Sequence, residues 1–201
     1  MKRSFLLCTI ACLLCTRVSA QSVAQLVQSI EAELAGTTDD IAFVTAIVYP
    51  ELLRYSQRRD QLEIALNKLL FSLSDEIDGC SIGAMQMKPR FAILVEQRIA
   101  EKAEWVQRYV AINFNGKNDS LNSRLARVER LQSLALQCLY LRAFIDTCTE
   151  TLQLAEKDTI YRLQILAAAY NAGMDRPLVQ LEQLRSLPHV VCAVEYYQRT
   201  D

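Results

Sequence analysis

Residues 167–173 read AAAYNAG, and the way this stretch must pack constrains the fold of the whole chain. Three consecutive alanines predict a helix that approaches its neighbours closely, because the distance between packed helices depends on the side chains at their contact. Gly173 fits the position just past a helix C-terminus, and Asn171 also suits a helix end. A helix end does not explain Tyr170, so this tyrosine is a candidate functional side chain.

Helical patterns of apolar residues extend from this stretch over most of the chain. Only five glycines and four prolines occur in 201 residues, too few for the closely spaced turns of a many-stranded sandwich or barrel. No repeat or linker divides the sequence, so we expect one all-α domain over residues 21–201. The patterns predict helices over 22–35, 58–73, 91–110, 121–145 (with a break around 147–151), 158–170, 177–186 and 189–199, and one through 43–48 that kinks or ends at Pro50.

Residues 1–20 have the pattern of a signal peptide. Lys2 and Arg3 precede an apolar run over residues 5–14, and the small side chains of 18–20 indicate cleavage before Gln21. An uncleaved anchor is the alternative, but the run is shorter than the roughly 20 residues that span a bilayer. We therefore expect an exported protein, periplasmic or associated with the cell envelope, with no integral membrane segment after cleavage.

The charge of the remaining chain argues against a nucleic-acid-binding protein. Residues 1–20 contain three of the 22 basic residues and none of the 23 acidic ones, which leaves 19 basic residues against 23 acidic ones and a net charge of −4. Proteins that bind nucleic acid show clusters of basic residues instead. The chain has one histidine, His189, and no CxxC spacing, so we expect neither a metal site nor a cofactor.

Four cysteines follow the signal peptide: Cys80, Cys138, Cys148 and Cys192. An even number of cysteines in an exported protein permits two disulfides, and the sequence does not choose among the three pairings. Cys138 and Cys148 are ten residues apart and are candidates to brace neighbouring helical turns.

A carboxylate stands at the end of an apolar helical pattern in residues 49–56, YPELLRYS. Glu51 there is either an ordinary exposed glutamate or a carboxyl at the floor of a cleft. In a cleft, loss of solvation raises the pKa of a carboxyl and keeps it protonated, so that it can donate a proton. Glu63 and Glu76 are the other candidates for the proton donor. They are less well placed for this role, because they fall inside a predicted helix or in the segment that follows it.

Residues 80–89, CSIGAMQMKP, make a poor amphipathic pattern but a suitable pocket wall. The Gln86 amide can form hydrogen bonds with a sugar, and Met85 offers an apolar face. Composition alone favours a loop with two core methionines.

Taken in order, these three segments resemble the soluble lytic transglycosylase family of the lysozyme-like superfamily, which includes goose-type lysozymes. In that family a glutamate ends a helix, a GLMQ-x-x-P segment lines the cleft and an AAYNAG segment closes the opposite side. Residues 83–89 match the second motif with Ala84 in place of leucine, and residues 168–173 match the third in full.

Further similarity extends the resemblance over about residues 40–200. Residues 139–142, LYLR, look like the YLR helix of the family, and His189-Val190 with Tyr196-Tyr197 is similar to its terminal segment, where His189 replaces a tyrosine. Two features depart from the family. Leu52 follows the glutamate where a serine is usual, and a helical insertion, about 57–78, separates Glu51 from the cleft segment.

The resemblance implies a lysozyme-like helical fold and cleavage of the bond between N-acetylmuramic acid and N-acetylglucosamine in peptidoglycan. Glu51 would act as acid and then base, with a 1,6-anhydro sugar as product, Tyr170 would orient Glu51, and Met85, Gln86 and Asn171 would hold sugars. A goose-type hydrolase would need a second carboxylate, for which Asp60, Asp75 and Asp78 are candidates. The same residues also fit a non-catalytic wall-binding protein or a purely structural helical bundle. The sequence is also compatible with an assembly partner in the cell envelope.

Overall fold

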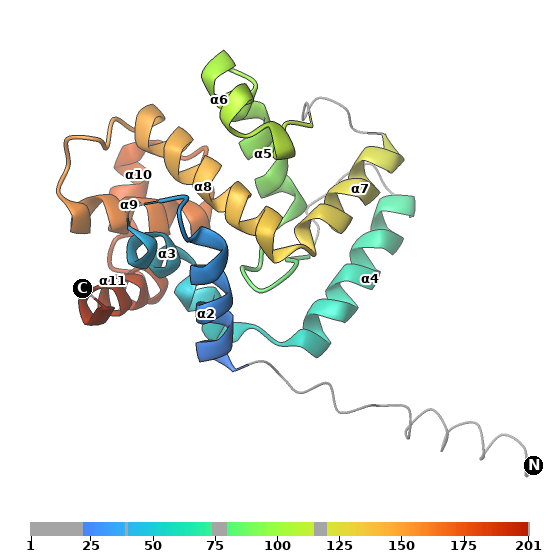
Figure 1. Cartoon of the computed structure of the whole chain (residues 1–201), viewed down its shortest axis with the longest axis horizontal. Coiled ribbons are helices and arrows are strands. Elements are labelled where there is room, and N and C mark those ends of the chain that lie inside the picture. The colour runs from blue at the N-terminus through green and yellow to red at the C-terminus, as the bar shows by residue number, and fades with distance from the viewer. Residues whose placement is uncertain (1–21, 39, 74–79, 115–119, 201) are drawn as a thin grey trace, which may run out of the picture.

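Most of the described chain is helical (Figure 1). The structure is a computed structural model that describes residues 22–38, 40–73, 80–114 and 120–200. Within these ranges there is no strand, and the only extended pairing is an isolated antiparallel bridge between Ile82 and Met87. The predicted all-α class is therefore confirmed. The elements are α2 (Val23–Leu34), α3 (Ile41–Arg54), α4 (Gln57–Leu73), α5 (Pro89–Ile99), α6 (Ala103–Arg108), η1 (Val110–Ile112), α7 (Leu121–Leu131), α8 (Leu134–Thr151), α9 (Thr159–Ala172), α10 (Leu178–Gln183) and α11 (Pro188–Thr200).

Some predicted features lie outside the described residues. These are the signal peptide over residues 1–20 and the end of the insertion, including Asp75, Glu76 and Asp78. Of the helices that the structure describes, none is both long enough and apolar enough to cross a lipid bilayer.

Helix α9 packs against four other helices and is buried over its middle turns. Ala167, Ala168 and Ala169 have no exposed surface, and α9 contacts α3, α8, α10 and α11. Helices α3, α9 and α11 gather on one side of the molecule, and α4 and α7 lie on the other (Figure 1). The small alanine side chains permit this close packing, which brings the C-terminal end of α9 beside the last turn of α3.

Helix α3 continues through Pro50, so of the two predicted outcomes, a kink or an end at the proline, the end is wrong. The helix begins after Asp40, whose carboxylate accepts a hydrogen bond of 2.8 Å from the Phe43 amide, and it ends at Arg54. Pro50 cannot donate to the carbonyl four residues earlier. Most of α3 is nevertheless buried against α2, α9 and α11, and this packing outweighs the missing hydrogen bond. Glu51 consequently lies inside the last turn of α3.

Two predicted helices are each divided in the structure. The pattern over 91–110 forms α5 and α6, and the pattern over 121–145 forms α7 and α8. Ser133 separates the second pair, because its hydroxyl accepts a hydrogen bond of 3.4 Å from the Leu136 amide and caps the start of α8. Helix α8 then runs through 147–151, where the sequence predicted a break.

The cysteine prediction is corrected by the continuity of α8. Cys138 and Cys148 both lie on this helix, where ten residues correspond to about 15 Å along the axis, well beyond the reach of a disulfide. All four cysteines, with Cys80 and Cys192, are free thiols in the structure. Burial raises the pKa of Cys138 and of Cys148 to about 12, so both behave as small apolar side chains.

The segment between α4 and α5 folds into a tight turn at residues 82–87. The backbones of Ile82 and Met87 exchange two hydrogen bonds of 2.9 and 3.0 Å, and the Gln86 amide donates to the Gly83 carbonyl at 3.0 Å. Gly83 has φ +72° and Gln86 has φ +52°. This turn forms one wall of the cleft described below.

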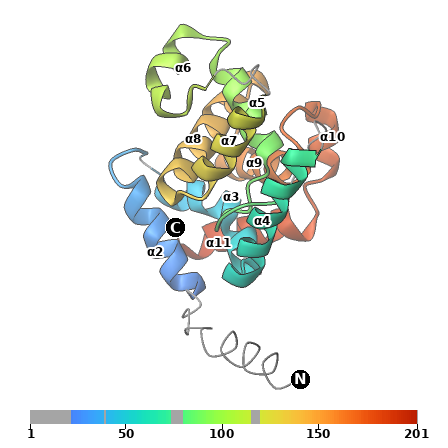
Figure 2. The same ribbon diagram turned by 90° about the vertical axis from the view of Figure 1, so that its right-hand side faces the viewer.

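Two buried polar side chains hold the turn in place. Gln137 of α8 donates to the Ile82 carbonyl at 2.9 Å and accepts from the Met85 amide at 3.2 Å. Asp60 of α4 accepts from the Gly83 amide at 2.6 Å. Helix α4 lies at one edge of the molecule in Figure 1 and in front in the turned view of Figure 2. Through the hydrogen bond of Asp60, α4 supports the cleft wall, although the sequence identified this helix only as an insertion.

We predict that Gly83→Ala lowers the free energy of unfolding by about 2–4 kcal/mol, measured by urea denaturation. An alanine at this position must adopt φ +72°, which is unfavourable for a residue with a Cβ. Its methyl group would also overlap the side-chain amide of Gln137. Gly36→Ala is the matched control, because Gly36 has φ +70° but no atom within 4 Å of the added methyl, so its cost should be about 1 kcal/mol. Equal losses at the two positions would contradict the tight packing of Gln137 on Gly83.

Candidate active site

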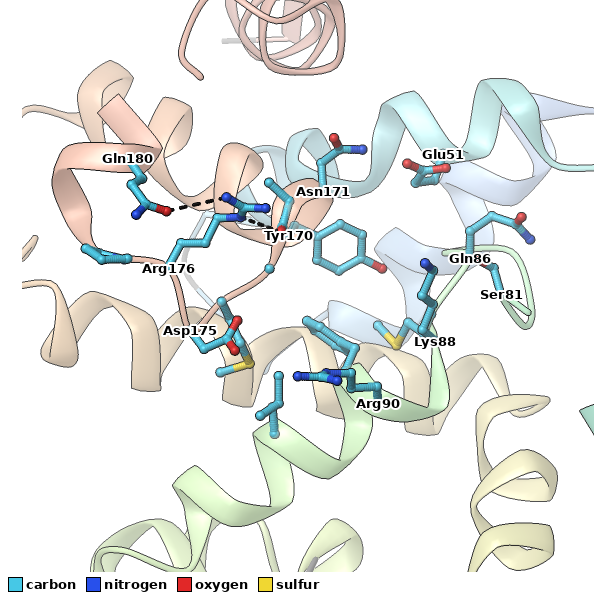
Figure 3. A pocket seen from close by; sticks show the side chains of 17 residues that line it. Glu51, Ser81, Gln86, Lys88, Arg90, Tyr170, Asn171, Asp175, Arg176 and Gln180 are labelled. Carbon is cyan, nitrogen blue, oxygen red and sulfur yellow. Dashed lines mark hydrogen bonds between the residues drawn. The ribbon is translucent and has the colours of Figure 1, made fainter. Parts of the chain in front are cut away.

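A cleft of about 690 Å³ lies where the last turn of α3, the 81–94 segment and the end of α9 meet (Figure 3). Four of the predicted site residues line it: Glu51, Gln86, Tyr170 and Asn171. The volume falls within the range of pockets that bind small organic ligands. The three segments singled out in the sequence thus come together in space.

Glu51 sits in this cleft with only 15% of its side chain exposed. Burial raises the pKa of its carboxyl above 4.5, and the charges of Arg54 and Arg59 and the neighbouring Asn171 amide oppose this shift. The Arg54 guanidinium is 3.7 Å from the carboxyl, but its own side chain is more than half exposed, so solvent weakens its effect. Glu51 is therefore suited to hold a proton and release it to a ligand.

His189 contacts the same carboxyl and was not among the predicted site residues. Its Nδ1 atom lies 3.4 Å from Glu51 Oε1 and 3.4 Å from the Asn171 side-chain nitrogen. Burial, with help from the Arg54 charge, lowers the pKa of His189 to about 4. The imidazole is consequently neutral near pH 7, so it packs against Glu51 without forming an ion pair with it. The sequence offered only the replacement of a family tyrosine by His189 as a hint.

Tyr170 anchors the cleft wall. Its hydroxyl donates a hydrogen bond of 2.6 Å to the Met85 carbonyl, which ties the end of α9 to the 82–87 turn. Phe91 and Phe144 pack on its ring with centroid distances of 5.2 and 5.7 Å. Burial and the nearby charge of Glu51 raise the pKa of the Tyr170 hydroxyl well above its usual value. The prediction that Tyr170 orients Glu51 stays a prediction.

Met85 does not face the cleft, which corrects its predicted role in holding a sugar. Its side chain is fully buried, and its backbone forms the hydrogen bonds with Tyr170 and Gln137. Met87 and Met174 line the cleft instead. Gln86, which lies between Met85 and Met87, has φ +52°, a backbone conformation that the sequence does not reveal.

Of the carboxylates considered as rivals or helpers of Glu51, the two that the structure describes, Glu63 and Asp60, do not line the cleft. Glu63 pairs with Arg59 at 2.8 Å on α4 and does not line the cleft. Asp60 is buried and is used by the Gly83 amide and by the Tyr55 hydroxyl, which is 3.3 Å away. The second carboxylate that lines the cleft is Asp175, which the sequence did not suggest, and Figure 3 shows it on the opposite side from Glu51.

Leu52, the departure from the family pattern, has a purely structural position. Its side chain is 1% exposed and points into the core, so the residue after Glu51 does not face the cleft. Gln86 lies on the opposite wall from Asn171, with Glu51 between them (Figure 3). Besides the Arg54 guanidinium, the polar groups around Glu51 include two amides and a neutral imidazole, which can form hydrogen bonds with an uncharged polar ligand.

No protein-family model, curated protein or solved structure matches this chain. The chemistry of the cleft therefore rests on its own residues.

We predict that His189 makes stability depend on pH between about 4 and 6.5. The folded-state pKa is below the unfolded value of 6.5, so the unfolded chain binds the extra proton, and stability is lost as pH falls from about 6.5 toward 4. Urea unfolding of wild type and His189→Gln at about pH 7 and pH 4 should show wild type losing up to about 3 kcal/mol more than the variant. His189 is the only histidine, and the opposite contribution of Glu51 is present in both proteins. Parallel pH profiles would refute the buried neutral imidazole.

Proposed function

We propose that this chain is a peptidoglycan lytic transglycosylase with a lysozyme-like fold, in which Glu51 is the catalytic acid and base. The observation that carries the proposal is the sheltered carboxyl of Glu51, whose pKa is raised by burial and which lines a cleft of sugar-binding size. The ordered motifs at 83–89 and 168–173, which form the walls of the same cleft, support it.

The proposed reaction begins when the Glu51 carboxyl donates its proton to the glycosidic oxygen, and the bond from this oxygen to C1 of N-acetylmuramic acid breaks. The carbonyl oxygen of the 2-acetamido group forms a bond to C1 and stabilises the positive charge. The Glu51 carboxylate then accepts the proton of the C6 hydroxyl while O6 attacks C1 and displaces the acetamido oxygen. The product is a 1,6-anhydro sugar, and Glu51 ends protonated, ready for another cycle.

This route needs one carboxyl, which agrees with the residues around Glu51. A hydrolase that activates water with a second carboxylate would require that carboxylate near the same glycosidic bond. Asp60 is committed to the Gly83 amide, and Asp175 lies across the cleft (Figure 3). On the described residues, which do not include the candidates Asp75 and Asp78, the lyase is preferred to the goose-type hydrolase.

The amides beside Glu51 provide contacts for the sugar. Asn171 and Gln86 flank the carboxyl and can bond hydroxyl and acetamido groups, and Phe91, Leu94 and Pro177 offer apolar surface to sugar rings. A neutral His189 leaves the proton on Glu51 undisturbed, because a protonated imidazole at 3.4 Å would favour the carboxylate. The predicted signal peptide agrees with action on the wall outside the cytoplasm.

We predict that Glu51→Gln reduces release of soluble fragments from purified sacculi by at least about 100-fold, because glutamine cannot transfer the proton. The rate is measured from the loss of turbidity and from the released sugars. Glu63→Gln is the matched control: it makes the same chemical change on α4, outside the cleft, and should keep wild-type activity. Equal release by wild type and Glu51→Gln, or no release by either, would overturn the enzymatic proposal and favour a wall-binding protein.

A further inference from the structure

Three basic side chains line the cleft. The lining contains Lys88, Arg90 and Arg176, but only two acidic residues, Glu51 and Asp175. The chain as a whole has slightly more acidic than basic residues. A positive cleft on such a chain points to recognition of a negatively charged ligand.

Lys88 and Arg90 stand on either side of Pro89 at the start of α5. Both side chains are exposed, and Lys88, although at the N-cap position, forms no side-chain capping hydrogen bond. Figure 3 shows Lys88 extending toward the side of the cleft that holds Glu51, and Arg90 extending toward Asp175. The two cations therefore follow the cleft rather than meeting at one point.

Arg176 reaches the cleft from the turn between α9 and α10, and its guanidinium is held in place. Nε donates to the Ala172 carbonyl at 2.7 Å, and Nη1 donates to Gln180 Oε1 at 3.4 Å. Fixing a charged side chain before the ligand arrives reduces the entropy lost on binding. The turn thus presents a preorganised cation at the end of the cleft away from Glu51 (Figure 3).

We propose that Lys88, Arg90 and Arg176 bind the carboxylates of peptide substituents on the glycan strand, so that the preferred substrate carries its peptides. This inference rests on the proposed function and names the substrate class of the same site. A stripped strand offers only the lactyl carboxylate of each N-acetylmuramic acid, which suits one cation. Cations that come from both the α5 start and the α9–α10 turn suit several carboxylates, as on an acidic peptide that lies along the cleft.

The test measures binding to Glu51→Gln protein by calorimetry, so that no turnover occurs. The probes are a peptidoglycan tetrasaccharide with its peptides, the same tetrasaccharide after removal of the peptides, and the neutral N-acetylglucosamine tetramer. We expect the affinity to fall in this order, and added salt to weaken binding of the first probe most. In the same background, Lys88→Glu should weaken binding of the first probe about five- to tenfold and leave the neutral tetramer unchanged.

Lys157→Glu is the matched control, because Lys157 is an exposed lysine outside the cleft lining, and it should bind all three probes as the parent does. Arg90→Gln serves as a second variant if Lys88→Glu fails to fold, as judged by circular dichroism. Equal affinity for the three probes, or equal effects of Lys88→Glu and Lys157→Glu, would overturn the inference while leaving cleavage by wild type intact. Charge-dependent binding without any cleavage by wild type would instead refute the proposed function and support this inference.

Discussion

The proposed chemistry of the cleft depends on the partial burial of the Glu51 carboxyl. A carboxyl surrounded by protein loses the solvation that favours its charged form, whereas Arg54 and Arg59 favour that form. Burial is the larger effect, and the exposed position of Arg54 limits the opposition. The last turn of α3 keeps the carboxyl in this position because α9 and α11 pack against that helix, bringing Asn171 and His189 to the same carboxyl.

The opposite wall is held by contacts between segments that are far apart in the sequence. The 82–87 turn is bonded by Asp60 from α4, by Gln137 from α8 and by the Tyr170 hydroxyl from α9. Each of these groups bonds a backbone amide or carbonyl of the turn, and an unpaired buried backbone group is costly. The geometry of the cleft therefore depends on three helices at once, and α4 belongs to its support.

Local patterns in the sequence predicted most helices, because burial on one face imposes a spacing that can be read from a single chain. They missed the ends set by one side chain, as at Ser133, and the continuation of α3 through Pro50, which tertiary packing decides. Glu51, Gln86, Tyr170 and Asn171 were correctly predicted to lie together. The burial of the Met85 side chain in the core and the contact between His189 and Glu51 depend on long-range packing, which no local pattern encodes.

If the Glu51 carboxyl is sheltered from solvent, its pKa must lie above the ordinary pKa of a glutamate side chain. Carbon-13 NMR titration of the glutamate side-chain carboxyls, with the Glu51 resonance assigned by its loss in a Glu51→Asp protein, measures this directly. We expect the Glu51 resonance to titrate at a pH clearly above 4.5, the usual value. Titration at or below that value would show a solvated carboxylate and would rule out Glu51 as the proton donor of the cleft.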